Sequence, residues 1–145
     1  MEFITIKNSK IDIEDFSPMN VVFSVVVNGE KLLLVKNKES NFFELPVTEI
    51  KTFVDNKQKM IEINNIITNE YELNIYDNEL IGICRIRFEN RDYDEFFGVN
   101  LIRVTEDCDP TNNEGINWYV QGEKWLNPIC RTSQMIMDFY WRLMV

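Results

Sequence analysis

The stretch VVFSVVVNGEKLLLVKN, residues Val21 to Asn37, decides the fold class. Its first part, Val21 to Val27, is dominated by β-branched valine, which favours a β-strand. Asn28-Gly29 follows directly and is the dipeptide that most strongly predicts a two-residue hairpin turn. Lys31 to Asn37 then supplies a second apolar strand. The stretch therefore predicts an apolar antiparallel hairpin.

Further strands are expected on both sides of this hairpin. The alternating residues before the break at Ser17-Pro18 predict one or two short strands within residues 1–15. FFELP, which ends at Pro46, predicts another short strand. Two longer strands, ELIGICRIRFEN and YDEFFGVNLIRVTE, are expected to be joined by a tight connection at Arg91-Asp92. INWYV predicts a further short strand after a polar loop.

Two helices complete the pattern. Met60, Ile63 and Ile67 recur at helical spacing after a candidate N-cap at Asp55-Asn56, which predicts a helix that runs to about Leu73. Residues 130–143 show a second helical pattern that closes the chain. Runs of strands with one central and one terminal helix indicate an α+β or α/β/α layered fold with a mixed sheet. Because repeats, linkers and low-complexity segments are lacking, residues 1–145 are expected to form a single domain.

Composition narrows the functional classes. The chain of 145 residues has a net charge of −9, and its Lys and Arg residues are scattered, so nucleic-acid binding is not expected. The absence of histidine removes the commonest general base and any His-dependent nucleophile. Cys84, Cys108 and Cys130 are widely spaced, and without histidine they do not predict a zinc site.

Membrane insertion and secretion are not expected either. The longest apolar run is only strand-length, whereas a bilayer-spanning helix needs about 20 apolar residues. The first residues, MEFITIKNSK, lack the basic start and apolar centre of a secretory signal. A cytoplasmic protein is therefore the default expectation.

The order of these parts resembles the Nudix hydrolases over nearly the whole chain. The apolar hairpin is followed by an aromatic-x-Leu-Pro strand at Phe43 to Pro46, a loop, a helix and two long strands. An acidic residue, Glu114, then precedes a strand that contains Trp118, a GEKWLNP turn and a closing helix. The resemblance implies a Nudix-like α/β/α sandwich with a central mixed sheet.

The functional signature of that family is Gly-x5-Glu-x7-Arg-Glu-bulky-x-Glu-Glu-x-Gly-bulky, whose carboxylates hold Mg²⁺ against a diphosphate. Here Val47-Thr48 follows Leu-Pro in place of the glycine pair. An ungapped count puts apolar side chains on all four glutamate positions, namely Val54, Ile63, Ile66 and Ile67.

An alignment with about three extra loop residues is more favourable, and it rests on NNIITNEYEL, residues 64–73. Ile67 and Leu73 then take the two bulky positions, and Glu70 takes the second glutamate of the pair. The other signature positions are substituted. Lys57 replaces the isolated first glutamate, and Asn65 replaces the arginine. Ile66 and Asn69 replace two further glutamates, and Glu72 replaces the final glycine. Both alignments indicate a degenerate signature.

The resemblance names a small set of candidate site residues. Glu70 is the candidate catalytic residue and metal ligand if the protein is active, with Mg²⁺ or Mn²⁺ as the cofactor; otherwise no cofactor is expected. Glu49 is a candidate second metal ligand, and an acidic loop around Glu106 to Glu114 is a further source of carboxylates. Solvation of that loop is the alternative.

Arg85 and Arg87 are the candidate ligand-binding residues. They lie two apart and therefore share one face of a predicted strand, where guanidinium groups suit a phosphate-containing ligand. The alternative is that both face solvent or pair with acidic neighbours.

Three functions follow as hypotheses. The first is a Nudix-fold protein with impaired catalysis that binds a small phosphate-containing ligand or acts in regulation. The second is an active metal-dependent pyrophosphohydrolase with relocated carboxylates, and the third is a structural or interaction domain. An aromatic surplus near the C-terminus, including Trp125 and Trp141, predicts a self-association surface and hence a homodimer.

Overall fold

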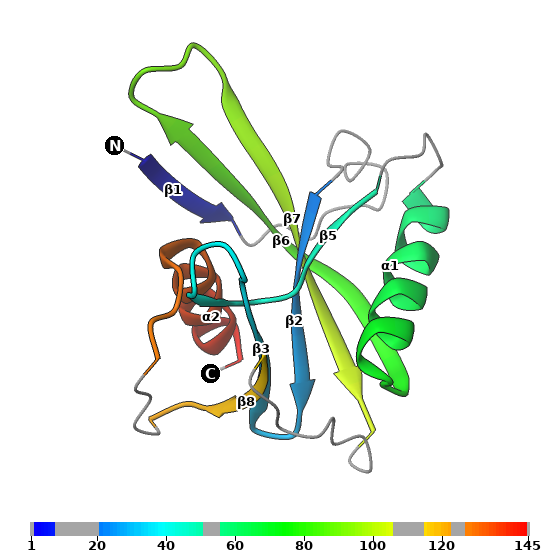
Figure 1. Cartoon of the computed structure of the whole chain (residues 1–145). Helices are drawn as coiled ribbons and strands as arrows, with labels where there is room; N and C mark the ends of the chain where they lie inside the picture. The colour runs from blue at the N-terminus through cyan, green and yellow to red at the C-terminus, as the bar shows by residue number, and fades with distance from the viewer. Residues whose placement is uncertain (1, 8–20, 51–55, 106–114, 123–126, 145) are drawn as a thin grey trace.

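The computed structural model describes residues 2–7, 21–50, 56–105, 115–122 and 127–144. In these ranges the strands form one eight-stranded sheet, with a helix on each side (Figure 1). The elements are β1 (Glu2–Lys7), β2 (Val21–Asn28), β3 (Lys31–Lys36), β4 (Phe43–Glu44), β5 (Val47–Glu49), α1 (Asn56–Tyr71), β6 (Ile75–Phe88), β7 (Asp94–Val104), β8 (Ile116–Val120) and α2 (Arg131–Leu143).

The sheet is mixed, as the sequence predicts. Its main path is β1-β6-β7-β2-β3-β4, with β5 paired to β2 and β8 paired to β3. β2 and β7 run parallel, and the other named strand pairs are antiparallel. Parallel neighbours far apart in the sequence cannot be joined by a hairpin, so the chain returns to β7 through α1 and β6.

The predicted β2–β3 hairpin is confirmed. Asn28 pairs with Lys31 across the turn, and Gly29 adopts a φ of +62°, which a residue without a side chain tolerates at little cost. The register of β2 with β3 extends only to Val27 and Leu32. The start of β2, at Val21, pairs with β5 instead. β2 and β3 therefore pair with each other only beside the turn, and the start of β2 has a different partner.

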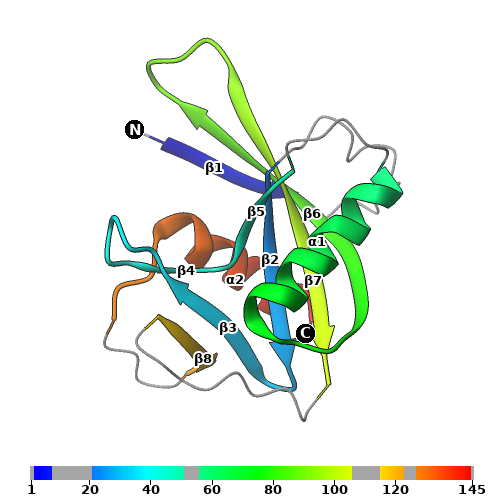
Figure 2. The same ribbon diagram turned by 45° about the vertical axis from the view of Figure 1, so that its right-hand side comes forward.

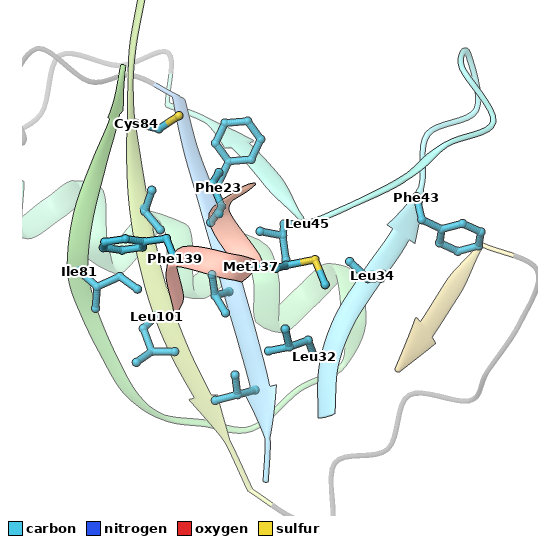
Figure 3. Close-up of a cluster of buried hydrophobic side chains, with 14 of the residues drawn as sticks. Phe23, Leu32, Leu34, Phe43, Leu45, Ile81, Cys84, Leu101, Met137 and Phe139 are labelled. Atoms are coloured by element: carbon cyan, nitrogen blue, oxygen red, sulfur yellow. The ribbon is translucent and has the colours of Figure 1, made fainter. Parts of the chain in front are cut away.

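The two faces of the sheet carry separate apolar clusters, which confirms the α/β/α arrangement. Figure 2 shows α1 crossing the sheet in front and α2 lying behind it. The cluster on the α2 side is drawn in Figure 3 and includes Phe23, Leu32, Leu34, Leu45, Leu101, Met137 and Phe139. The cluster on the α1 side includes Val22, Val26, Leu33, Ile63, Ile67, Leu73, Ile102 and Trp118. Alternate residues of β2 and β3 enter opposite clusters, because successive side chains of a strand point to opposite faces.

α1 ends at Tyr71 through a left-handed residue. Glu72 has a φ of +54°, and the N–H of Leu73 donates to the carbonyl of Thr68 at 3.3 Å. This geometry satisfies a carbonyl of the last helical turn and directs Leu73 into the core, where 1% of it is exposed. The chain then enters β6.

β4 is tied to the start of α2 by buried and backbone hydrogen bonds. The N–H of Leu45 donates to the Oγ of Ser133 at 3.0 Å, and the N–H of Cys130 donates to the carbonyl of Phe43 at 2.8 Å. The N–H of Phe43 donates in turn to the carbonyl of Pro128 at 2.8 Å. These bonds fix the short strand that carries Glu44.

Two strands differ from the sequence prediction: β6 begins at Ile75, before the predicted ELIGICRIRFEN, and β5 was not predicted. VTEIKTFV contains β5, Val47–Glu49, for which the sequence predicts no element. The candidate N-cap Asp55, the acidic loop of residues 106–114, and most of the GEKWLNP turn, including Trp125, lie outside the described residues. Within the described ranges no helix is long and apolar enough to cross a membrane. Cys84 and Cys130 are both free thiols, and Cys108 is outside these ranges.

Candidate functional site

A cleft of about 710 Å³ opens beside the C-terminal end of α1. Ligand pockets for small molecules commonly measure about 300–1,000 Å³, so the cleft has the size of such a site. It is bounded by the end of β3 and the β3–β4 loop, by β4 and β5, by α1 and by the start of β8. The lining residues are Val35, Lys36, Asn37, Lys38, Glu39, Glu44, Val47, Glu70, Tyr71, Gly115 and Ile116.

α1 contributes Glu70 and Tyr71 to this cleft. Burial raises the pKa of the Tyr71 phenol most, and the negative charge of Glu70, a hydrogen bond with Glu70 and the charge of Glu44 raise it further. The phenol is therefore neutral at physiological pH. Glu44 and Glu70 line the same cleft as this phenol.

Glu44 is a site residue that sequence reasoning missed. It lies opposite Val35 in the β3–β4 pair and is half-buried in the cleft. Burial raises the pKa of its carboxyl group, and a hydrogen bond from the amide of Asn37 partly offsets this effect. The donor and acceptor, Asn37 Nδ2 and Glu44 Oε1, are 3.4 Å apart. The sequence signal available for Glu44 is its place inside the FELP strand, between two buried apolar residues.

Arg85 and Arg87 do share a face, but they do not line the cleft. They pair across the sheet with Asp94: Arg85 Nε is 2.7 Å from one carboxylate oxygen and Arg87 Nε is 3.2 Å from the other. Hydrogen bonds from Arg87 and Arg85 lower the pKa of Asp94. Arg85 also lies over the ring of the exposed Phe96, 5.9 Å from its centroid. Both arginines therefore belong to the outer part of the β6–β7 hairpin, which projects beyond β2 (Figure 1).

Glu49 also lies away from the cleft. It ends β5, is exposed and pairs with Val21 of β2, whereas Val47 of the same strand lines the cleft. The acidic residues of loop 106–114 are outside the described ranges. Among the described residues, no group of three or more His, Cys, Asp or Glu side chains is arranged to hold a metal ion. The described carboxylates that line the cleft are Glu39, Glu44 and Glu70.

Comparison with curated protein sequences gives partial matches. No family model matches the chain. The bifunctional protein GlmU of Streptococcus thermophilus is 37% identical over 82 residues, which cover 50% of this chain and 18% of that protein. GlmU of Streptococcus gordonii is 30% identical over 112 residues, which cover 70% of this chain and 24% of that protein. The chain thus spans a quarter or less of the length of the curated relatives it matches.

Solved structures match over most of the chain. The pyrophosphohydrolase BsRppH of Bacillus subtilis superposes with a TM-score of 0.64 at 11% identity, covering 99% of this chain and 96% of that one. The chain has the Nudix fold. A MutT Nudix hydrolase from Burkholderia pseudomallei, with a TM-score of 0.51 at 14% identity, covers 81% of this chain and 94% of its own. The C-terminal domain of mouse MUTYH, solved in complex with human PCNA, gives a TM-score of 0.51 at 13% identity.

The structure also shows the surroundings of the residues that the sequence alignment placed on signature positions. Glu72, at the position of the final signature glycine, adopts the left-handed conformation that favours glycine. Ile67 and Leu73, on the two bulky positions, are each 1% exposed. Ile66, one helical turn before Glu70, is 39% exposed.

Proposed function

We propose that this Nudix-fold protein is a ligand-binding or regulatory domain with impaired hydrolysis, and that its cleft takes a small phosphate-containing ligand. The observation that carries the proposal is the contribution of α1 to the cleft. Of the described α1 residues, Glu70 and Tyr71 line it, so the helix supplies a single carboxylate. The cleft nevertheless has the volume and the mixed polar and apolar lining of a small-molecule site.

The chemistry of diphosphate hydrolysis explains why one helical carboxylate matters. Metal ions in such a reaction offset phosphate charge and generate or orient the attacking water. Removing one positioned electrostatic group commonly lowers a rate by about 10²–10³. Ile66 and Asn69 replace two further carboxylates of the signature. Binding can survive such losses, since it does not require the transition state to be stabilised.

A second candidate function is an active pyrophosphohydrolase with relocated carboxylates. The observation that favours it is the half-buried Glu44, which lines the cleft together with Glu39 and Glu70. Mg²⁺ is often bound through one or two carboxylates together with substrate phosphates and water. In this alternative, cleavage depends on Glu44 and Glu70. The MUTYH domain, solved with PCNA, supports a protein-interaction role as a third candidate.

Ligand binding is tested by isothermal titration of the protein with a panel of nucleoside diphosphate derivatives, with and without Mg²⁺. We expect at least one compound to bind the wild type and to bind Glu70→Gln with altered affinity. Glu30→Gln is the matched control, because Glu30 makes the same charge change in the exposed β2–β3 turn. If no compound binds, or if both variants change affinity equally, the cleft is not the binding site.

A further inference from the structure

We infer that Asn37 is a positioning residue that holds the Glu44 carboxylate in the cleft, where it accepts a hydrogen bond from an N–H or ammonium group of the ligand. The inference rests on the proposed function, because it specifies what the phosphate-containing ligand carries beside its phosphate. It is drawn from three features of the structure: the bonding of the β3–β4 loop, the unfilled acceptor capacity of Glu44 and the apolar walls around it.

Asn37 organises the loop that forms one wall of the cleft. Its side-chain Oδ1 accepts hydrogen bonds from the N–H groups of Glu39 and Ser40, at 2.9 and 3.3 Å. Its backbone N–H donates to the carbonyl of Phe42 at 2.8 Å, and its carbonyl accepts from the N–H of Asn41 at 2.9 Å. An asparagine that binds the backbone two residues ahead in this way fixes a tight turn.

The other end of the same side chain reaches Glu44. With Oδ1 committed to the loop, Nδ2 is oriented toward the carboxylate and lies 3.4 Å from Oε1. The two ends of one planar amide therefore couple the loop conformation to the direction of the Glu44 side chain. Asn37 also lines the cleft, and its proposed role is to act through Glu44.

Glu44 retains acceptor capacity that the described protein does not fill. An ionised carboxylate offers about four lone-pair positions. In the described part of the chain, Asn37 is the donor that reaches this carboxylate. Partial burial removes water from the Glu44 carboxylate, which is unfavourable when so few protein donors replace it. A hydrogen bond from the ligand would make up for this lost hydration. A charge-assisted hydrogen bond of this kind is stronger than a neutral one.

The surroundings of Glu44 define the ligand group further. Val35, Val47 and Ile116 give the cleft apolar walls, and the neutral phenol of Tyr71 lies beside the carboxylate. The charged groups that face it are Lys36, Lys38 and Glu39 from β3 and the loop, and Glu70 from α1. With two cationic and three anionic side chains, the lining favours a ligand that carries both a phosphate and a positively charged or N–H donor group.

A matched pair of probes tests this preference: 2-aminoethyl phosphate, which carries an ammonium group, and ethyl phosphate, which does not. We expect wild type to bind 2-aminoethyl phosphate about tenfold more tightly, the effect of one charge-assisted hydrogen bond. Glu44→Gln should lose most of the preference, and Asn37→Ala, which removes the donor to Glu44 without adding a charge, should reduce it. Equal binding of the two probes would overturn the inference and leave the phosphate cleft in place. If neither probe binds, the phosphate cleft of the proposed function is itself contradicted.

The positioning role has its own measurement, which needs no ligand. The ¹³C carboxyl resonance of Glu44 is titrated in the wild type, Asn37→Asp and Asn41→Asp. Asn37→Asp keeps an Oδ acceptor for the loop but replaces the donor to Glu44 by a negative charge, so the titration midpoint should rise. Asn41→Asp makes the same charge change in the same exposed loop and should shift the midpoint less. Equal shifts in both variants would show that Asn37 has no specific hold on Glu44.

Discussion

Replacing Glu72 by glycine should stabilise the protein, because Glu72 ends α1 in a conformation that disfavours a side chain. Its φ of +54° brings Cβ close to the following carbonyl oxygen, which costs an L-residue roughly 1–2 kcal/mol. Glycine avoids this cost but gains about 0.4–1 kcal/mol of conformational freedom in the unfolded chain. The backbone part of the effect of Glu72→Gly is therefore a gain of about 0.5–1 kcal/mol, or about 1–4 °C in Tm for a chain of this size.

Glu72→Ala separates the backbone effect from the charge effect. Both variants remove a negative charge near the C-terminus of α1. This removal is expected to stabilise the protein by about 0.3–1 kcal/mol. Only the glycine variant also relieves the left-handed conformation. Urea unfolding should therefore give a higher midpoint for Glu72→Gly than for Glu72→Ala at an unchanged slope. A glycine variant no more stable than the alanine variant would refute the left-handed helix end.

Three further predictions concern stability. Ser133→Ala should lower the free energy of unfolding by about 1–3 kcal/mol, since the buried N–H of Leu45 loses its acceptor; an unchanged urea midpoint would contradict this. Because folding raises the pKa of Glu44 above 4.5, its ionisation opposes folding as pH rises past 4.5; Glu44→Gln should be more stable than wild type at pH 7 and not at pH 4. Asp94, whose pKa is lowered from 3.8, stabilises the fold above that pH and loses this effect on acidification; Asp94→Asn should therefore flatten the acid limb of a pH-stability curve.

Local patterns account for most of the fold. Valine-rich strands joined by Asn28-Gly29, and helices with apolar residues at helical spacing, determine their own secondary structure and their buried faces. β5 was not predictable in this way, because Val47–Glu49 has no extended pattern. It becomes a strand only when the chain returns to the start of β2, a pairing decided by tertiary structure.

The candidate site was predictable in part. Glu70 was a candidate because of the alignment to the Nudix signature, and the structure places it in the lining of the cleft. Glu44 carries no comparable signal, because a single glutamate in a short strand is ordinary. Its significance depends on Asn37 and Tyr71, which the β3–β4 loop and α1 contribute to the same cleft.

Strand periodicity predicts the face on which Arg85 and Arg87 lie, but not the residues that they contact. Alternation places Arg85 and Arg87 on one face, and the structure agrees. Which residues oppose them depends on the register of β6 with β7, which the sequence does not specify. That register places Asp94 opposite Arg87. Arg85 and Arg87 therefore bind the carboxylate of Asp94 and do not line the cleft.

Phosphorus NMR of a panel of nucleoside diphosphate derivatives, incubated with concentrated protein and Mg²⁺ or Mn²⁺, tests the central claim most directly. One spectrum reports both binding, as shifted or broadened resonances, and cleavage, as new phosphate resonances. We predict that the resonances of at least one compound are perturbed without cleavage, and that Glu70→Gln changes the perturbation. New resonances that appear with the wild type and disappear with Glu70→Gln would contradict this prediction and establish a working hydrolase.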